Sequence, residues 1–307
     1  MTGASVTPSD IEAAAGRLAG LVRHTPVLRL AAGELGVDFP MTLKLELLQH
    51  AGSFKPRGAF NRMLTAGALP AAGVIAASGG NHGAAVAYVA QALGCPAEIF
   101  VPGLTPASKL ARIAGFGATL VQGGAGYAEA LEASRVRQAE TGALEVHAYD
   151  HPAVLAGQGT VGREFGMDAP ELTHVLVATG GGGLIGGIAA WYCGRVRVIS
   201  VEPEGCPSLH DALAAGRPVA AAVGGVAASS LGARQVGGVM FPIARAHVAE
   251  AVLVTEAAIT EACAVLWDRL RLVAEPGGAV ALAALLSGAW VPPRDSQVGV
   301  VVCGSNA

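Results

Sequence analysis

The chain has 307 residues, of which 52% are apolar and only 14% charged, and its net charge is −3. This length supplies a core for one large or two medium domains, and the small net charge provides no field for nucleic acid or an anionic membrane. Glycines and polar residues interrupt every apolar run, so we expect no membrane-spanning helix. The five single cysteines have neither disulfide nor zinc spacing, and residues 1–5 lack the features of a signal peptide. Together these features predict a cytoplasmic protein.

The N-terminal part is predicted to begin with a helix and to continue in extended segments. We predict the helix over residues 9–22, with Ser9 or Asp10 as its N-cap, because both side chains can bind a free backbone N–H. Residues 24–28 are extended, since a residue before proline avoids helical angles, and residues 42–46 alternate as a strand.

The rest of the chain alternates between buried strands and helices in two series. In the first, strands are predicted at 74–77, 97–101 and 119–121, and helices at 86–93, 109–113 and 127–136. In the second, a helix starts at 157–160, and strands follow at 175–178, 196–202 and 300–302. Such alternation is typical of parallel sheets. We therefore predict two open, mostly parallel α/β domains, the large one from residues 1–72 and 148–307 and the small one from 73–147.

Lysine is rare in this chain, which makes one of its positions informative. Only Lys44, Lys55 and Lys109 occur, so nearly all of the 20 basic residues are arginines. A lysine amine can lose its proton and attack a carbonyl, whereas a guanidinium cannot. Burial between Phe54 and Pro56 favours the neutral, nucleophilic form of Lys55. Taken alone, a surface lysine in a Gly/Pro turn is the alternative.

Four consecutive glycines, beginning at Gly180, follow a predicted strand and open a helix. Their backbone N–H groups and the helix N-terminus can hold a phosphate. The same stretch, as far as Gly186, also matches the dinucleotide motif GxGxxG, and Glu202 then stands where a carboxylate binds the ribose. On these residues alone, an NAD-dependent oxidoreductase is favoured. That function leaves Lys55 without a role, and the motif comes only after a complete first series of strands and helices.

A second loop of small residues, from Ser78 to Gly83, follows the strand at 74–77. Its backbone N–H groups suit a carboxylate, and the Asn81 amide suits a ring oxygen. The alternative is a glycine-rich turn in which Asn81 only caps the next helix and His82 is structural. Cys303 ends the last strand before another small-residue turn, where a buried thiol is by default inert.

Together these motifs resemble the fold-type II pyridoxal phosphate enzymes, specifically the serine/threonine dehydratase (ammonia-lyase) and serine racemase group. The resemblance spans nearly the whole chain. It is carried by residues 43–46, 52–59, 78–82, 156–160, 180–185, 201–203 and 275–276. Several such motifs in this order are specific, whereas each one alone is not.

The resemblance implies that pyridoxal 5'-phosphate lies in the cleft between the domains, with Lys55 bound to it covalently and later removing the α-proton of the substrate. The implied cofactor-binding residues are Phe54, Lys55, Asn81, Gly180, Gly181, Gly182, Gly183, Leu184, Glu275 and Cys303. The implied substrate-binding residues are Ser78, Gly79, Gly80, Asn81 and His82. A neutral thiol beside the pyridine nitrogen does not keep that nitrogen protonated, which favours elimination of a β-hydroxyl.

The implied reaction converts a β-hydroxy amino acid, L-serine or L-threonine by default, to a 2-oxo acid and ammonia. A racemase or a β-replacement synthase of the same fold is the alternative, although racemases of this group have a serine at the position of Gly79. Metal-dependent members have an acidic residue where this chain has Ser208, so Glu202 is a metal candidate without its partner and we predict no metal site. We also expect a homodimer and an amino acid as the small-molecule partner. The sequence ends soon after Cys303, so no C-terminal regulatory domain is expected.

Overall fold

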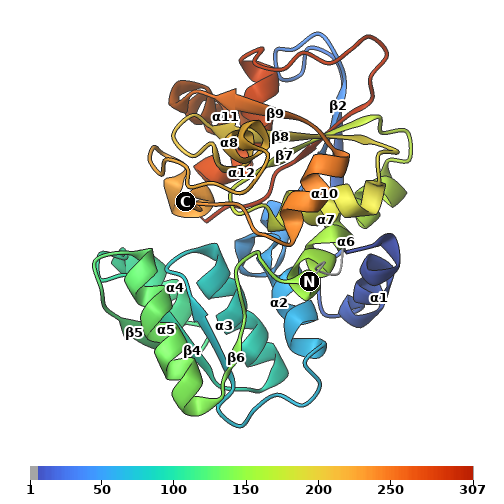
Figure 1. Ribbon diagram of the computed structural model, residues 1–307. Coiled ribbons are helices and arrows are strands. Elements are labelled where there is room, and N and C mark those ends of the chain that lie inside the picture. Colours follow the sequence, from blue (N-terminus) through green and yellow to red (C-terminus); the bar gives the residue numbers. More distant parts are fainter. Residues whose placement is uncertain (1–5, 307) are drawn as a thin grey trace.

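Two separate sheets organise the protein in the computed structural model, which describes residues 6–306. Residues 1–5, on which the prediction about a signal peptide rests, and residue 307 lie outside the described part. Figure 1 shows the smaller sheet at the lower left and the larger sheet above it. In the described part, no helix is both long and apolar enough to cross a membrane.

The large sheet has six strands in the order β1-β2-β10-β7-β8-β9. The strands are β1 Val27–Leu30, β2 Met41–Lys44, β7 His174–Ala178, β8 Arg197–Pro203, β9 Val248–Val254 and β10 Val298–Val301. Only the β1–β2 pair is antiparallel. Every residue of β7 and β10 is buried, as expected where helices cover both faces of a parallel sheet.

Helices lie on both sides of the large sheet, with α8, α11 and α12 on one side and α6, α7 and α10 on the other (Figure 1). The helices outside the small sheet are α1 Pro8–Leu18, α2 Lys55–Leu64, α6 Pro152–Asp168, α7 Gly183–Tyr192, α8 Ser208–Ala215, α9 Ala228–Leu231, α10 Met240–His247, α11 Glu256–Leu270 and α12 Pro276–Leu286. Two short 3-10 turns, η1 Glu46–Leu48 and η2 His50–Gly52, connect β2 to α2.

The small sheet has four parallel strands in the order β5-β4-β3-β6. Its elements are β3 Val74–Ala77, α3 Asn81–Leu93, β4 Ala97–Val101, α4 Ala107–Ala114, β5 Thr119–Gln122, α5 Tyr127–Thr141 and β6 Leu144–Glu145. Along β3, Val74 and Ala76 pack on the side of α3, while Ile75 and Ala77 pack on the side of α5. This is the two-residue period of a strand that is covered on both faces. The predicted α/β fold with two mostly parallel sheets is confirmed.

Helix α2 lies between the two units, because it packs on both of them. Ala59, Phe60 and Met63 join the core beneath the small sheet, and the helix also contacts α6 of the large unit. The strands of the small sheet all lie between residues 74 and 145. The exact limits of 1–72 with 148–307 and of 73–147 stay a prediction.

Three details of the predicted helices are wrong. Helix α1 ends at Leu18, four residues before the predicted end at residue 22. Helix α1 begins after Thr7, and the carboxylate of Asp10 accepts a hydrogen bond from the Thr7 backbone N–H at 2.9 Å, so Asp10 completes a capping box rather than being the cap. Residues 157–160 lie inside α6, not at its start. A Cβ at Gly157 would lie 2.5 Å from the Arg57 carbonyl oxygen. The glycine is therefore needed for the close approach of α2 to α6.

Candidate active site

Lys55 is the first residue of α2, and its amine lies beside the segment that joins β6 to α6. Its Nζ donates a hydrogen bond to the Ala148 carbonyl oxygen at 3.1 Å and lies 5.0 Å from the centre of the Phe54 ring. Burial lowers the pKa of Lys55 to about 8, against the opposing effect of nearby Cys303 and Glu275. A lysine with such a pKa is about one tenth neutral at pH 7, several hundred times the neutral fraction of an ordinary lysine, as a nucleophilic amine requires.

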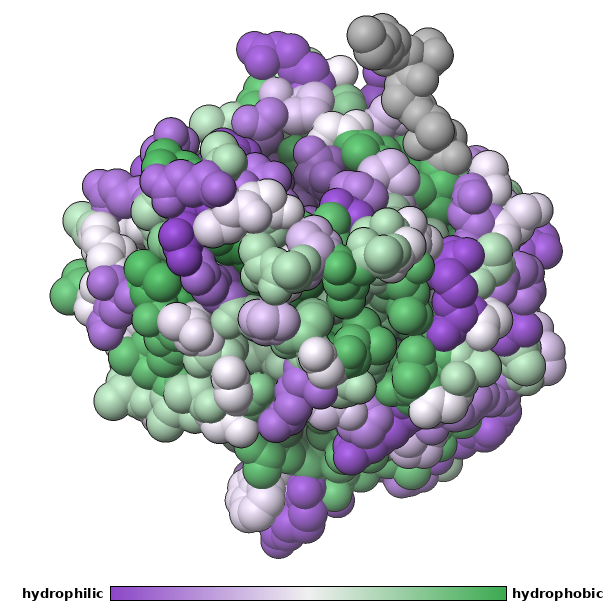
Figure 2. All heavy atoms as spheres, turned by 90° about the horizontal axis from the view of Figure 1, so that it is seen from below, coloured by the Kyte–Doolittle hydropathy of each residue, from purple (hydrophilic) through white to green (hydrophobic). Residues whose placement is uncertain are grey.

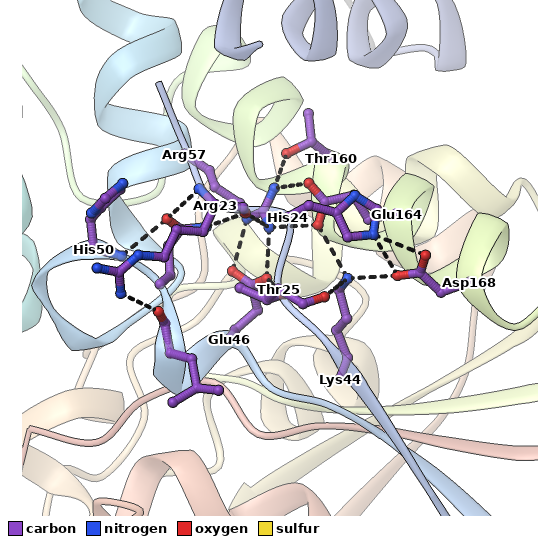
Figure 3. Close-up of polar contacts among 12 residues, drawn as sticks. Arg23, His24, Thr25, Lys44, Glu46, His50, Arg57, Thr160, Glu164 and Asp168 are labelled. Carbon is purple, nitrogen blue, oxygen red and sulfur yellow. Dashed lines mark hydrogen bonds and ion pairs between the residues drawn. The ribbon is translucent and has the colours of Figure 1, made fainter. Parts of the chain in front are cut away.

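A buried ion network fixes the helix that carries Lys55 (Figure 3). Arg57, with no exposed side-chain surface, donates to Glu46 at 2.8 and 2.7 Å and to Glu164 at 2.7 and 2.8 Å. It also donates to the Thr160 hydroxyl at 3.1 Å. Burial works against the charge on Arg57, yet the two carboxylates hold its pKa above its ordinary value. The start of α2 is thereby tied to η1 and to α6.

The same network extends to Lys44 on β2 (Figure 3). The Lys44 amine lies 3.1 Å from a Glu164 oxygen and 3.0 Å from an Asp168 oxygen, and it donates to the Thr25 carbonyl at 2.7 Å. Burial alone would raise the pKa of Glu164, but Arg57 and Lys44 hold it below the ordinary value. Lys44 is therefore a partner in an ion network and not a second free amine.

A second polar group forms where Asn81, Glu275 and Cys303 meet. Asn81 is the first residue of α3, and its amide nitrogen donates to a Glu275 carboxylate oxygen. Burial raises the pKa of Glu275 to about 7 and that of Cys303 to about 12. The Cys303 thiol is thus neutral, and its Sγ lies 3.4 Å from the Gly277 carbonyl oxygen. The Phe54 backbone N–H donates to the Cys303 carbonyl at 3.3 Å, which brings this group next to Lys55.

The loop from Ser78 to His82 follows β3, and Asn81 joins it to Glu275 and Asn306 by hydrogen bonds. The Ser78 hydroxyl accepts a hydrogen bond from the Gly80 N–H at 3.2 Å. A Cβ at Gly79 would lie 2.6 Å from the Thr105 hydroxyl oxygen. The Nε2 of buried His82 lies 2.7 Å from the Val146 carbonyl, which makes Nε2 the protonated nitrogen. Burial lowers the pKa of His82 to about 3, so its ring is neutral.

The four glycines form the turn between β7 and α7. Gly182 has φ of +88°, a conformation that favours glycine. A Cβ at Gly181 would lie 2.3 Å from the Tyr149 ring, and one at Gly180 would lie 2.9 Å from the Leu231 backbone. The first N–H groups of α7, including that of buried Leu184, have no partner inside the helix. The turn therefore offers free backbone N–H groups of the kind that bind an anion, and its glycines have no room for side chains.

Glu202, the metal and ribose candidate, is fully buried at the end of β8 and caps α8. One carboxylate oxygen accepts from the Ser208 hydroxyl at 3.1 Å and from the Leu209 N–H at 2.7 Å. The other accepts from the His210 N–H at 2.7 Å. Across residues 6–306, no three His, Cys, Asp or Glu side chains come together as a metal site. Both oxygens of Glu202 are therefore occupied by a helix N-terminus.

We expect Glu202→Ala to lower the free energy of unfolding by about 1–3 kcal/mol, because it leaves buried N–H groups of α8 without an acceptor. Urea unfolding measures this, and Ser208→Ala, which removes a single donor, is the matched variant with the smaller loss. Unfolding of the wild type should be the same in magnesium and in a chelator. A large stabilisation by magnesium would instead favour a metal at Glu202.

Comparisons with known proteins identify the family. Residues 18–304 match the family described as "Pyridoxal-phosphate dependent enzyme". The chain belongs to this family. It is 41% identical to an L-threonine ammonia-lyase of Geobacter sulfurreducens over 281 residues, which cover 90% of this chain and 70% of the relative. A phenylserine dehydratase of Ralstonia pickettii is 34% identical, covering 98% of this chain and 94% of the relative. The structure of maize serine racemase has a TM-score of 0.92 and 31% identity, covering 99% and 94% of the two chains.

These relatives confirm the predicted group of pyridoxal-phosphate-dependent enzymes, and the cofactor is pyridoxal 5'-phosphate. The residues described above fit it. The glycine turn presents free backbone N–H groups at the start of α7 and leaves no room for a side chain on its glycines, and Lys55 offers an amine of lowered pKa to an aldehyde. The centre of the Phe54 ring lies 5.0 Å from that amine, and Cys303 and Glu275 are close enough to influence its pKa. The nicotinamide alternative is not retained, because Glu202 has no free oxygen for a ribose.

We expect the cofactor-free enzyme to take up pyridoxal 5'-phosphate at a rate that rises about tenfold per pH unit and then levels off, because only the neutral amine attacks an aldehyde. The levelling should occur near pH 8, where the Lys55 amine has its pKa of about 8. Absorbance changes after mixing, recorded from about pH 6 to about pH 10, measure this rate. A rate that is flat across this range would contradict attack by the neutral amine.

Four residues of this site were given no role by the sequence analysis. They are Arg57, Ala148, Tyr149 and Asn306. Arg57 belongs to the motif at residues 52–59, which carries the family resemblance. Only 14% of the chain is charged, so an arginine among apolar residues is a sign of a buried charge. Asn306 is one of three asparagines in the chain and lies in a small-residue turn. Ala148 acts through its carbonyl, so no side-chain pattern could reveal it.

Proposed function

We propose that this protein is an ammonia-lyase that converts a β-hydroxy amino acid, L-serine or L-threonine by default, to a 2-oxo acid and ammonia by α,β-elimination. The observation that carries the proposal is the partly buried Lys55 amine of lowered pKa together with a neutral, buried Cys303 thiol that acts on it. Relatives named L-threonine ammonia-lyase and phenylserine dehydratase support it.

In this proposal, bound pyridoxal 5'-phosphate stabilises negative charge at the substrate's α-carbon. Lys55 Nζ takes the α-proton and, held by the Ala148 carbonyl, stays close to that carbon. The backbone N–H groups of the loop from Ser78 hold the substrate carboxylate, and Asn81 offers its amide to the cofactor ring. Cys303 supplies no charge to the pyridine nitrogen, because its pKa is raised to about 12. The β-hydroxyl takes up a proton and leaves as water, and hydrolysis of the released enamine then gives the 2-oxo acid and ammonia.

A racemase is the second candidate, since the structure of maize serine racemase superimposes on nearly the whole chain. Gly79 bears no hydroxyl to return a proton on the face opposite Lys55. One purified sample should be tested for ammonia release from serine, threonine, hydroxyaspartate and phenylserine, for serine inversion, and for deuterium exchange into alanine. Ammonia release without inversion supports the lyase. Inversion or exchange without ammonia release supports the racemase, and release only with an added nucleophile supports a β-replacement synthase.

We also propose a homodimer in the cytoplasm. Large hydrophobic side chains, among them Leu48, Trp267 and Val273, are exposed. Figure 2 shows one face on which hydrophobic residues gather between hydrophilic ones, as interaction surfaces often do. The cysteines are free thiols, which supports a reducing compartment. Light scattering behind a sizing column tests the dimer, and a mass of one chain contradicts it.

A further inference from the structure

Asn306 joins three segments of the active site through a single amide group. Its Nδ2 donates to the Asn81 side-chain oxygen at 2.7 Å and to the Ala51 carbonyl oxygen at 2.8 Å. Ala51 belongs to η2, directly before Lys55, and Asn81 opens α3 of the small domain. Asn306 itself follows Cys303 in the turn after β10. One side chain therefore links the lysine, the asparagine and the cysteine of the site.

The atoms that face each other leave only one orientation for these amides. The Ala51 carbonyl oxygen can only accept, so Asn306 must turn its nitrogen toward it. The same nitrogen meets Asn81, which must therefore present its oxygen to Asn306. The Asn81 nitrogen then faces Glu275 and donates to it. Asn306 thereby holds Asn81 with its nitrogen on the side of Glu275.

The backbone before Lys55 is shaped to meet Asn306. Ala51 has φ of +55°, a left-handed conformation that is unfavourable for alanine, and Gly52 has φ of +71°. A Cβ at Gly52 would lie 2.5 Å from the Asn306 side-chain oxygen. The Ser305 N–H adds a hydrogen bond to the Gly52 carbonyl at 2.9 Å. The left-handed turn is thus held by hydrogen bonds from the turn of Asn306.

We propose that Asn306 is a positioning residue for the elimination: it fixes the orientation of the Asn81 amide and the turn that aims Lys55. The proposal rests on the roles given above to Asn81 and Lys55. Asn306 touches neither substrate nor cofactor in this role. It acts through the hydrogen bonds of its amide nitrogen to Asn81 and Ala51. A side chain needs an NH₂ group at this distance from the backbone to make both bonds.

Asn306→Asp tests the orientation without removing the side chain. The new carboxylate has nearly the same shape but can only accept, so Asn81 is expected to rotate, donate to it and turn its oxygen toward Glu275. The hydrogen bonds to the Ala51 carbonyl and to Glu275 are then lost, so the melting temperature should fall, and the test is whether cofactor affinity falls further than it does in the control below. The dissociation constant for pyridoxal 5'-phosphate, from a fluorescence titration, should rise about tenfold, since a donor to the cofactor is replaced by an acceptor. Turnover should fall at least as much, with a smaller change in KM.

Asn61→Ala is the matched control. Asn61 also bridges two segments through its amide, accepting from Arg17 at 2.7 Å and donating to the Ala153 carbonyl at 2.6 Å. Its loss should lower the melting temperature but leave cofactor affinity within about twofold, because its partners lie outside the site. The proposal is overturned if Asn306→Asp binds the cofactor as tightly as the wild type does. It is also overturned if the loss of affinity is no larger than that of the control at the same loss of melting temperature. If no hydroxy amino acid is a substrate, the proposed reaction fails, while cofactor affinity still decides the role of Asn306.

Discussion

Replacing Lys55 by alanine is expected to reduce ammonia release by roughly 10⁴-fold or more, as when a covalent catalytic group is lost. The chain has two other lysines, but neither can take this role. Lys44 is fully buried between Glu164 and Asp168, and Lys109 lies on α4. The comparison is made by coupling 2-oxo acid formation to a lactate dehydrogenase assay on wild type and variant.

Lys55→Arg is the matched control, because it keeps the positive charge while a guanidinium does not attack a carbonyl. It should be as inactive as the alanine variant. Borohydride reduction of the cofactor-loaded wild type, followed by peptide mapping, should label Lys55 and leave Lys44 and Lys109 unmodified. Full 2-oxo acid production by Lys55→Ala, or a label on another lysine, would falsify the assignment.

Arg57→Ala is expected to lower the free energy of unfolding by about 3–5 kcal/mol, because it leaves two buried carboxylates without their cation. Glu46 has no exposed side-chain surface and Glu164 only 12%, so water cannot replace the guanidinium. The measurement is urea unfolding near pH 8. Despite burial, Arg57 holds the pKa of Glu164 below its ordinary value, so the stability that this pair contributes is present at high pH and is lost as Glu164 is protonated. The difference between wild type and variant should therefore shrink as the pH is lowered.

Arg163→Ala is the control on the neighbouring helix α6. Arg163 pairs with Glu12 at 2.8 Å, but both side chains are partly exposed, at 27% and 51%. Its loss should therefore be about 0–1 kcal/mol. Equal losses for the two arginines would show that the buried network contributes no more than a surface pair. If Arg57→Ala does not fold, Arg57→Lys, which keeps the charge but not the fork of donors, should give an intermediate loss.

The alternation of strands and helices could be predicted from the sequence because apolar runs of strand length separate turns rich in glycine. It located β3, β4, β5, β7 and β8. Strand β6 has only two residues, too few for a period to show. The predicted helix start at residues 157–160 is wrong, because these residues lie inside α6. A sequence does not distinguish a glycine at the start of a helix from a glycine that allows two helices to pack closely. Gly157 is of the second kind.

The residues of the candidate site could be predicted where a local motif carries them. Lys55, Asn81 and the glycine turn each stand in a short pattern with its own chemistry. Arg57 and Asn306 act through partners far away in the sequence, such as Glu164 and Ala51, and no local pattern encodes such a contact. The residues that recognise the substrate's β-substituent cannot be located from sequence either, because tertiary packing brings them together.

The position of β10 in the large sheet determines how late during translation this sheet can be completed. β10 lies between β2 and β7, pairing with both of them. During translation these two strands leave the ribosome long before β10 does, and their inner edges stay open to wrong partners. Cys303 and Asn306 arrive later still. The nascent chain must therefore be kept from aggregating until its last strand has been synthesised, and only then can it enclose a vitamin-derived cofactor.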